Sequence, residues 1–118
     1  MAVSTNEVTS KQCHAASIYA SFNFTTTGTS EEIDCTERPI SQFSIQATSS
    51  GSPTLWTAIL EGSINGSNWD SMITNTNVIG LNIIQVTPIG PVRYFRVRVT
   101  SLTLLSAPSI NINVFGVR

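Results

Sequence analysis

Charge is what this sequence most lacks. Only 11% of its 118 residues are Asp, Glu, Lys or Arg, against about 25% in an ordinary globular domain. The formal net charge of -1 provides no general attraction to nucleic acid or to acidic membranes, so neither is predicted as a partner. Because Ser, Thr and Asn replace the missing charges, we expect a surface of hydroxyl and amide groups.

Histidine, cysteine and long apolar runs are also scarce. The single His14 has no recognisable Ser and Asp partners, and the chain has too few His and Cys for a four-ligand zinc site, so we expect no metal and no cofactor. Cys13 and Cys35 are predicted to be semi-buried thiols, although adjacent strands could bring them into a disulfide. No apolar run reaches the roughly 20 residues of a membrane helix. The polar start, MAVSTNEVTSKQC, contains no signal-peptide core.

Helical periodicity is absent, and alternation with a period of two takes its place. Apolar and polar residues alternate in AASIYASFNFTTT, SQFSIQATSS, TLWTAILEGSI, VRYFRVRVTSL and PSININVFGV, with shorter strands expected over 33–36, 68–73 and 82–87. Turn-forming stretches such as SSGSP, PIGPV and SAP separate them. The pattern predicts an all-β chain of about eight strands, folded as an antiparallel, jelly-roll-like two-sheet β-sandwich.

The length fits one domain and is too short for two. Residues 13–118 are predicted to form the sandwich. Residues 1–12 are polar and show no alternation, so we expect an arm that is flexible or docked on a partner.

The stretch LEGSINGSNWDSM, residues 60–72, combines a turn signal with possible ligand-binding groups. Asn65-Gly66 is the dipeptide that two-residue hairpin loops favour, so it is predicted to be the turn between two strands. Trp69 is expected in the core at the base of this hairpin. A calcium site built from the oxygens of Asn65, Ser67, Asn68 and Asp70 would contain a single carboxylate, which favours the turn interpretation.

Two clusters of opposite charge are the candidates for a partner interface. Acidic residues gather in EEIDCTE, and arginines with a tyrosine gather in RYFRVR. In a homo-oligomer the acidic strand of one subunit could meet the arginines of the next, although the two clusters could equally pair within one chain. The acidic segment lacks the aromatic neighbours of a carboxylate hydrolase, so no catalytic residue and no enzyme is expected. The predicted interface residues are Glu31, Glu32, Asp34, Glu37, Tyr94, Arg96 and Arg98.

A longer pattern joins the hairpin WTAILEGSINGSNWD, residues 56–70, to PVRYFRVRVT, residues 91–100, and PSININVFG, residues 108–116. Over residues 40–118 the chain resembles small β-sandwich structural proteins of tailed bacteriophages. That resemblance implies a virion protein made in the bacterial host cytoplasm, either a capsid decoration (cement) protein or a head-fibre, neck or tail appendage. It also implies a homo-oligomer, preferentially a trimer, and the major capsid protein or another virion protein as partner.

The hairpin and the arginine strand also resemble discoidin-like carbohydrate-binding sandwiches, in which loop aromatics and acids bind the ligand. Here the loops SSGSP, NTNVIG and SAP contain neither. We therefore expect a non-enzymatic virion structural protein, a decoration protein that binds and stabilises the assembled head. The alternative is a carbohydrate- or host-surface-binding module of a phage tail or fibre, which an exposed Trp56 or Trp69 would favour.

Overall fold

The computed structural model describes residues 8–13, 17–48, 55–76, 85–104 and 109–118, and for residues 8–13 and 85–90 only the course of the backbone. Within these ranges every regular element is a strand, and none is a helix with the length and apolarity that a membrane crossing requires. The strands are β1 (Val8–Cys13), β2 (Ser17–Phe24), β3 (Gly28–Thr29), β4 (Ile33–Asp34), β5 (Ile40–Thr48), β6 (Leu55–Ser63), β7 (Asp70–Thr76), β8 (Gln85–Val92), β9 (Tyr94–Thr103) and β10 (Ile110–Val117).

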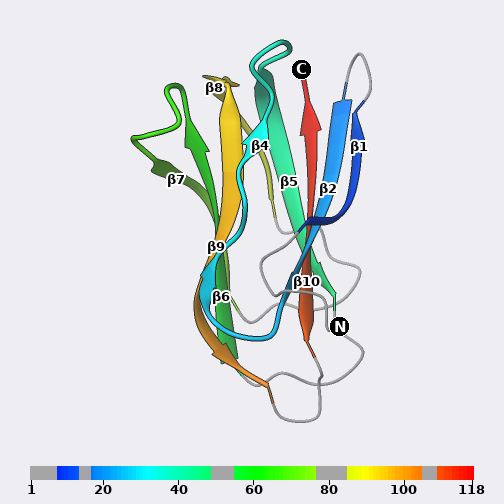
Figure 1. Ribbon diagram of the computed structural model, residues 1–118, viewed down its shortest axis with the longest axis vertical. Coiled ribbons are helices and arrows are strands. Elements are labelled where there is room, and N and C mark those ends of the chain that lie inside the picture. The colour runs from blue at the N-terminus through cyan, green and yellow to red at the C-terminus, as the bar shows by residue number, and fades with distance from the viewer. Residues whose placement is uncertain (1–7, 14–16, 49–54, 77–84, 105–108) are drawn as a thin grey trace.

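These strands form two antiparallel sheets that pack face to face (Figure 1). Sheet A has the order β1-β2-β10-β5-β8. Sheet B has the order β3-β9-β6-β7, and β4 also pairs with β9. The predicted all-β, antiparallel two-sheet sandwich is therefore confirmed. The ten strands of the described residues exceed the predicted number through β1 and β3: β1 lies where an arm was expected, and β3 forms where the chain after β2 meets the edge of β9.

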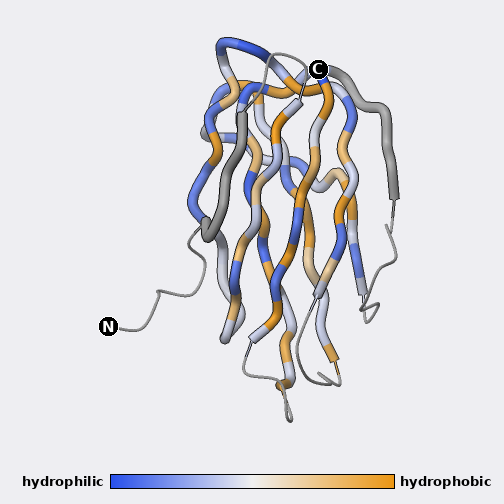
Figure 2. Tube along the Cα trace, turned by 90° about the vertical axis from the view of Figure 1, so that its right-hand side faces the viewer, coloured by the Kyte–Doolittle hydropathy of each residue, from blue (hydrophilic) through white to orange (hydrophobic). Residues whose placement is uncertain are grey.

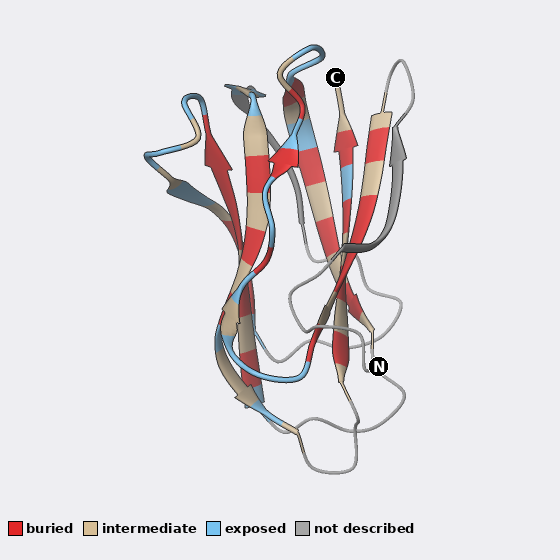
Figure 3. Cartoon of the chain, viewed as in Figure 1, coloured by how far each residue is buried: buried red, intermediate tan, exposed pale blue. Residues whose placement is uncertain are grey.

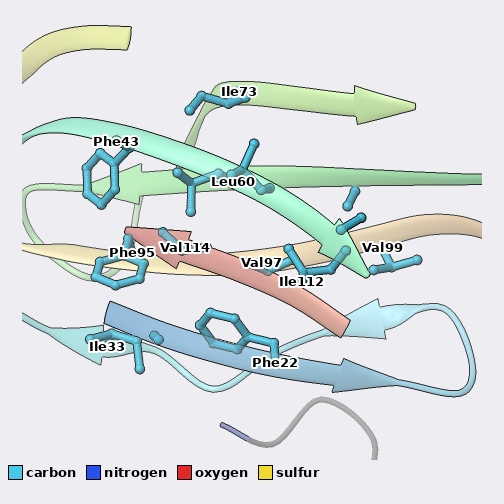
Figure 4. Close-up of a cluster of buried hydrophobic side chains, with 14 of the residues drawn as sticks. Phe22, Ile33, Phe43, Leu60, Ile73, Phe95, Val97, Val99, Ile112 and Val114 are labelled. Carbon is cyan, nitrogen blue, oxygen red and sulfur yellow. The ribbon is translucent and has the colours of Figure 1, made fainter. Parts of the chain in front are cut away.

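Alternation along the strands places one face of each sheet in the core (Figures 2 and 3). The predicted inward residues of β10, Ile110, Ile112 and Val114, are fully buried. Figure 4 shows side chains of both sheets meeting between the layers. The rings of Phe43 and Phe95 lie edge to face, with their centres 5.2 Å apart. Burying one such side chain contributes about 1.5–3 kcal/mol, so this layer supplies the main stabilisation of the sandwich.

The core leaves no space for a side chain at Gly116. A Cβ at this position would lie 2.7 Å from Ile40 Cγ2 and 3.1 Å from Ile18 Cγ2. The preceding residue, Phe115, belongs to the opposite face of β10 and is 45% exposed. Because Gly116 must face the core, its neighbour Phe115 must face outward, and its ring is exposed.

The arm predicted over residues 1–12 is wrong for residues 8–12. Strand β1 pairs with the edge of β2, with Ser10 opposite Ser21 and Gln12 opposite Tyr19. A polar segment can join a sheet edge without apolar alternation, because the unpaired backbone groups of the edge provide the hydrogen bonds. Residues 1–7 of the predicted arm lie outside the described residues.

Candidate functional site

The structure brings the two predicted charged clusters to one sheet. Strand β4 pairs with β9, so that Asp34 lies opposite Tyr94 and Ile33 lies opposite Phe95. The exposed residues are the four acids, Glu31, Glu32, Asp34 and Glu37. The half-buried residues are Tyr94, Arg96 and Arg98. The clusters are therefore neighbours within one subunit. Their contact with a partner remains a prediction.

Both arginines of the cluster pair with Glu61 of β6. Arg96 Nε donates a 2.8 Å hydrogen bond to Glu61 Oε1. Arg98 Nε lies 3.2 Å from Oε2, an ion pair without hydrogen-bond alignment. The Glu61 side chain is only 7% exposed, against 25% for Arg96 and 43% for Arg98. A carboxylate this deeply buried requires such compensation.

Glu61 is the residue of this cluster that the sequence analysis missed. Its signal in the sequence is a single acid at a polar position of TLWTAILEGSI. Its partner becomes identifiable only from the pairing of β6 with β9, in which Glu61 lies opposite Arg96.

Trp69 lies against this ion pair and not in the core, so its predicted position is wrong. The guanidinium carbon of Arg96 lies 4.0 Å from the centre of its ring, a cation–π contact, and the residue is half-buried. The last β6–β7 pair joins Gly62 to Asp70, so Trp69 belongs to the loop before β7. Trp56 is 1% exposed in the core. Neither tryptophan is the exposed platform that a carbohydrate-binding loop would need.

The β6–β7 hairpin exists as predicted, but its loop covers residues 64–69 and not two residues. Asn65 Oδ1 accepts hydrogen bonds from the backbone N–H groups of Ser67 and Asn68, at 2.8 and 2.9 Å. Ser63 Oγ accepts from the N–H of Gly66, whose φ is 77°. These side-chain oxygens accept hydrogen bonds from the backbone N–H groups of the loop, so a loop longer than two residues is stabilised. Because Asn65 Oδ1 is occupied in this way, turn chemistry explains the residue better than cation binding.

An open groove of about 350 Å³ lies beside this loop. Met72, Pro91 and Val92 form its apolar wall, while Asn68 and Asp70 contribute polar groups. Among the described residues, no three His, Cys, Asp or Glu side chains gather closely enough to hold a metal ion. The groove is therefore suited to a mixed apolar and hydroxyl-bearing ligand or to a protein contact.

A second hollow, of about 300 Å³, lies between the β4–β5 turn and the C-terminal residue. Arg118 bridges this end of the sandwich by donating to the carbonyl oxygens of Arg38, at 3.0 Å, and Ser17, at 2.8 Å. Cys35 is buried here, with Sγ 3.4 Å from the carbonyl oxygen of Val92. The side chain of Cys13 lies outside the described residues, so the predicted state of the two thiols remains a prediction.

Comparison with known proteins adds one finding about the fold. No family model matches the chain, and no curated protein matches it. Among solved structures, it is similar to the crystal structure of the SPBc2 prophage-derived protein YomS, with a TM-score of 0.57 and 12% identity. The match covers 91% of this chain and 99% of YomS. What the two chains share is the fold.

Proposed function

We propose that this protein is a non-enzymatic structural protein of a bacteriophage virion and acts as a decoration protein that binds the assembled head as a homo-oligomer. The observation that carries the proposal is the shared fold with prophage-derived YomS over nearly the whole of both chains. That likeness supports a phage origin. The choice of a capsid decoration role comes from the resemblance of residues 40–118 to phage sandwich proteins.

The strand order is a further support. We interpret β2-β10-β5-β8 facing β4-β9-β6-β7 as the path of a jelly roll, a sandwich used by viral capsid proteins and by lectins. A rigid sandwich suits a protein that clamps the junctions between coat subunits of an expanded shell. Two exposed apolar side chains, Leu55 and Ile64, are available for contact with such a shell.

The ion pairs modify the predicted interface. Because Arg96 and Arg98 share the single carboxylate of Glu61, one of their two positive charges is balanced within the subunit. Glu32 and Glu37, in contrast, are exposed. We therefore expect the acidic segment, more than the arginines, to provide the charged contact with a coat protein.

Binding to heads tests the proposal directly. Purified protein is mixed with expanded and unexpanded shells of a phage that encodes it, and the shells are sedimented. We expect saturable binding to expanded shells, a higher melting temperature of the decorated shells, and weaker binding by the double variant Glu32→Lys, Glu37→Lys. The variant Thr74→Lys, on a distant exposed position of β7, is the matched control. Absence of the protein from purified virions would contradict the proposal.

A carbohydrate- or host-surface-binding module of a tail or fibre is the second candidate. The groove beside the β6–β7 loop favours it, because Asn68 and Asp70 offer hydrogen bonds next to the exposed Ile64. Specific binding to tails, or to host cell-wall polysaccharide with loss of binding in Asp70→Ala, would favour this candidate over the first.

A further inference from the structure

The outer face of sheet A is uncharged at every described position of its three central strands. Register aligns β2, β10 and β5, and every second residue faces outward: Ser17 to Asn23, Asn111 to Val117, and Gln42 to Thr48. These positions carry Ser, Thr, Asn, Gln, Tyr, Phe and Val, and no Asp, Glu, Lys or Arg. We term this surface the neutral face. The outer face of sheet B differs, since it holds the pair of Glu61 with Arg96.

Phe115 stands near the middle of the neutral face. It lies opposite Tyr19 of β2 and opposite Ser44 of β5, and it is 45% exposed. A shift of β10 by one residue would turn Phe115 inward, but it would also expose Ile112 and Val114. The crowded position of Gly116 prevents an aromatic ring from packing there. The fold therefore maintains an exposed ring on an otherwise polar, uncharged surface.

A hollow of about 160 Å³ lies next to this ring, bounded by Tyr19, Gln46 and Asn113. The Asn113 side chain is held in place, since its Oδ1 accepts from Tyr19 Oη at 3.1 Å and from Ser21 Oγ at 2.8 Å. Surfaces fixed before binding lose less conformational entropy in a complex. The neutral face thus carries a projecting ring and a preformed hollow side by side.

We propose that a second copy of this chain covers the neutral face, with the two A sheets face to face about a two-fold axis and each Phe115 against the hollow of the other copy. In such an interface each copy presents the same surface, so projection and hollow must lie on one face, as they do here. A second copy brings no charge to this surface and leaves no ion without water. Interface centres are typically poor in charge and rich in aromatic residues.

The size of the face fits a weak, concentration-dependent contact. Its three strands at ordinary spacing, about seven residues long, cover roughly 14 by 23 Å, or ~330 Å² per copy. Two copies would bury about 660 Å², which is in the range of weak contacts and below the ~1,000 Å² of a stable interface. A two-fold contact closes at two copies, so it predicts a dimer, or an even multiple, in place of the trimer that the phage resemblance implies.

Sedimentation equilibrium over a range of concentrations tests the inference. We expect the average mass of the unmodified protein to rise from one copy toward two copies as its concentration increases. Phe115→Ser removes the ring, and Gln46→Glu places like charges in the contact, so each should raise the dissociation constant at least tenfold. The matched controls, Ile64→Ser and Thr74→Glu, remove an exposed apolar side chain and add a charge elsewhere, and they should leave the mass unchanged. Far-UV circular dichroism verifies that each variant is folded.

The inference rests on the proposed function only for the expectation of self-association, and the two can fail separately. A monomer, or a trimer that persists in Phe115→Ser, would overturn the inference, whatever the protein does on heads. A monomer whose Tyr19 and Phe115 resonances shift on addition of maltotriose would also overturn it and assign the face to a neutral glycan. A dimer that Phe115→Ser dissociates supports the inference, even if shell binding then contradicts the decoration role.

Discussion

Glu61 shows how a carboxylate can be almost wholly buried on the outer face of a sheet. Arg96 hydrogen-bonds one oxygen, Arg98 lies near the other, and the ring of Trp69 covers Arg96. The arginines remain partly exposed, so the pair is less strongly desolvated than a fully interior one and contributes less. These side chains link β6, β9 and the loop of residues 64–69.

Replacing Glu61 by Gln should lower the free energy of unfolding by about 2 kcal/mol, since a neutral amide cannot compensate two neighbouring guanidinium groups. Urea denaturation measures this change. The control Glu32→Gln alters an exposed acid and should stay within about 0.5 kcal/mol of the unmodified protein. Equal stability of the two variants would show that Glu61 is not a stabilising partner of the arginines.

Strands β3 and β4 together act as one interrupted edge strand along β9. Between them, the N–H of Ser30 donates to the carbonyl oxygen of Val97 at 2.8 Å. The N–H of Val97 donates to Ser30 Oγ at 2.9 Å, so a side-chain oxygen replaces a backbone carbonyl in the ladder. Because Ser30 is buried, water cannot readily take over this role.

Ser30→Ala should therefore leave the amide of Val97 without an acceptor and cost about 1–3 kcal/mol of stability. Faster hydrogen exchange at the Val97 amide is the specific readout. Thr29→Ala, at an exposed position of β3, is the control and should leave that exchange rate unchanged. Unaltered protection of Val97 in Ser30→Ala would contradict the assigned role.

The β6–β7 loop depends on a left-handed backbone conformation at Gly66. A Cβ there would lie 3.5 Å or more from neighbouring side chains, so the cost of a substitution is backbone strain and not crowding. Gly66→Ala should destabilise the protein by about 1–2 kcal/mol, and Gly66→Asn by less, because Asn tolerates this conformation. Thermal unfolding of both variants gives the comparison. Equal losses would indicate that the side chain at this position is crowded after all.

At the scale of the whole molecule, the two outer faces differ in chemistry. Sheet A presents the neutral face, and sheet B presents a charged cluster beneath Trp69. If the carbohydrate candidate used the loop tryptophan, its ligand would stack on a ring that Arg96 already covers on one face. The two candidate functions therefore predict different responses of Trp69 to sugars.

In the variant Trp56→Phe, Trp69 is the remaining tryptophan, and we expect acrylamide to quench its emission because the residue is partly exposed. Added glucose or maltotriose should leave the emission unchanged. Saturable quenching by either sugar would favour the carbohydrate-binding module over the decoration protein.

The sequence predicted most of the strands and their buried faces, because side-chain alternation is a local property. The inward sides of β2, β5 and β10 follow directly from it. It failed for Trp69 and for the length of the β6–β7 loop, where hydrogen bonds accepted by the Asn65 side chain decided the geometry. It also missed β1 as a sheet strand, since an edge strand can form without apolar alternation.

The period-two pattern and the scarcity of charge determined by themselves that this chain folds as a sandwich with few charges on its surface. Tertiary structure alone decided which side chains meet on that surface. Glu61 meets Arg96 because β6 pairs with β9, and Tyr19 meets Phe115 because β2 pairs with β10, near the opposite end of the chain. Such pairings depend on how the whole core packs, so no local pattern in the sequence encodes them.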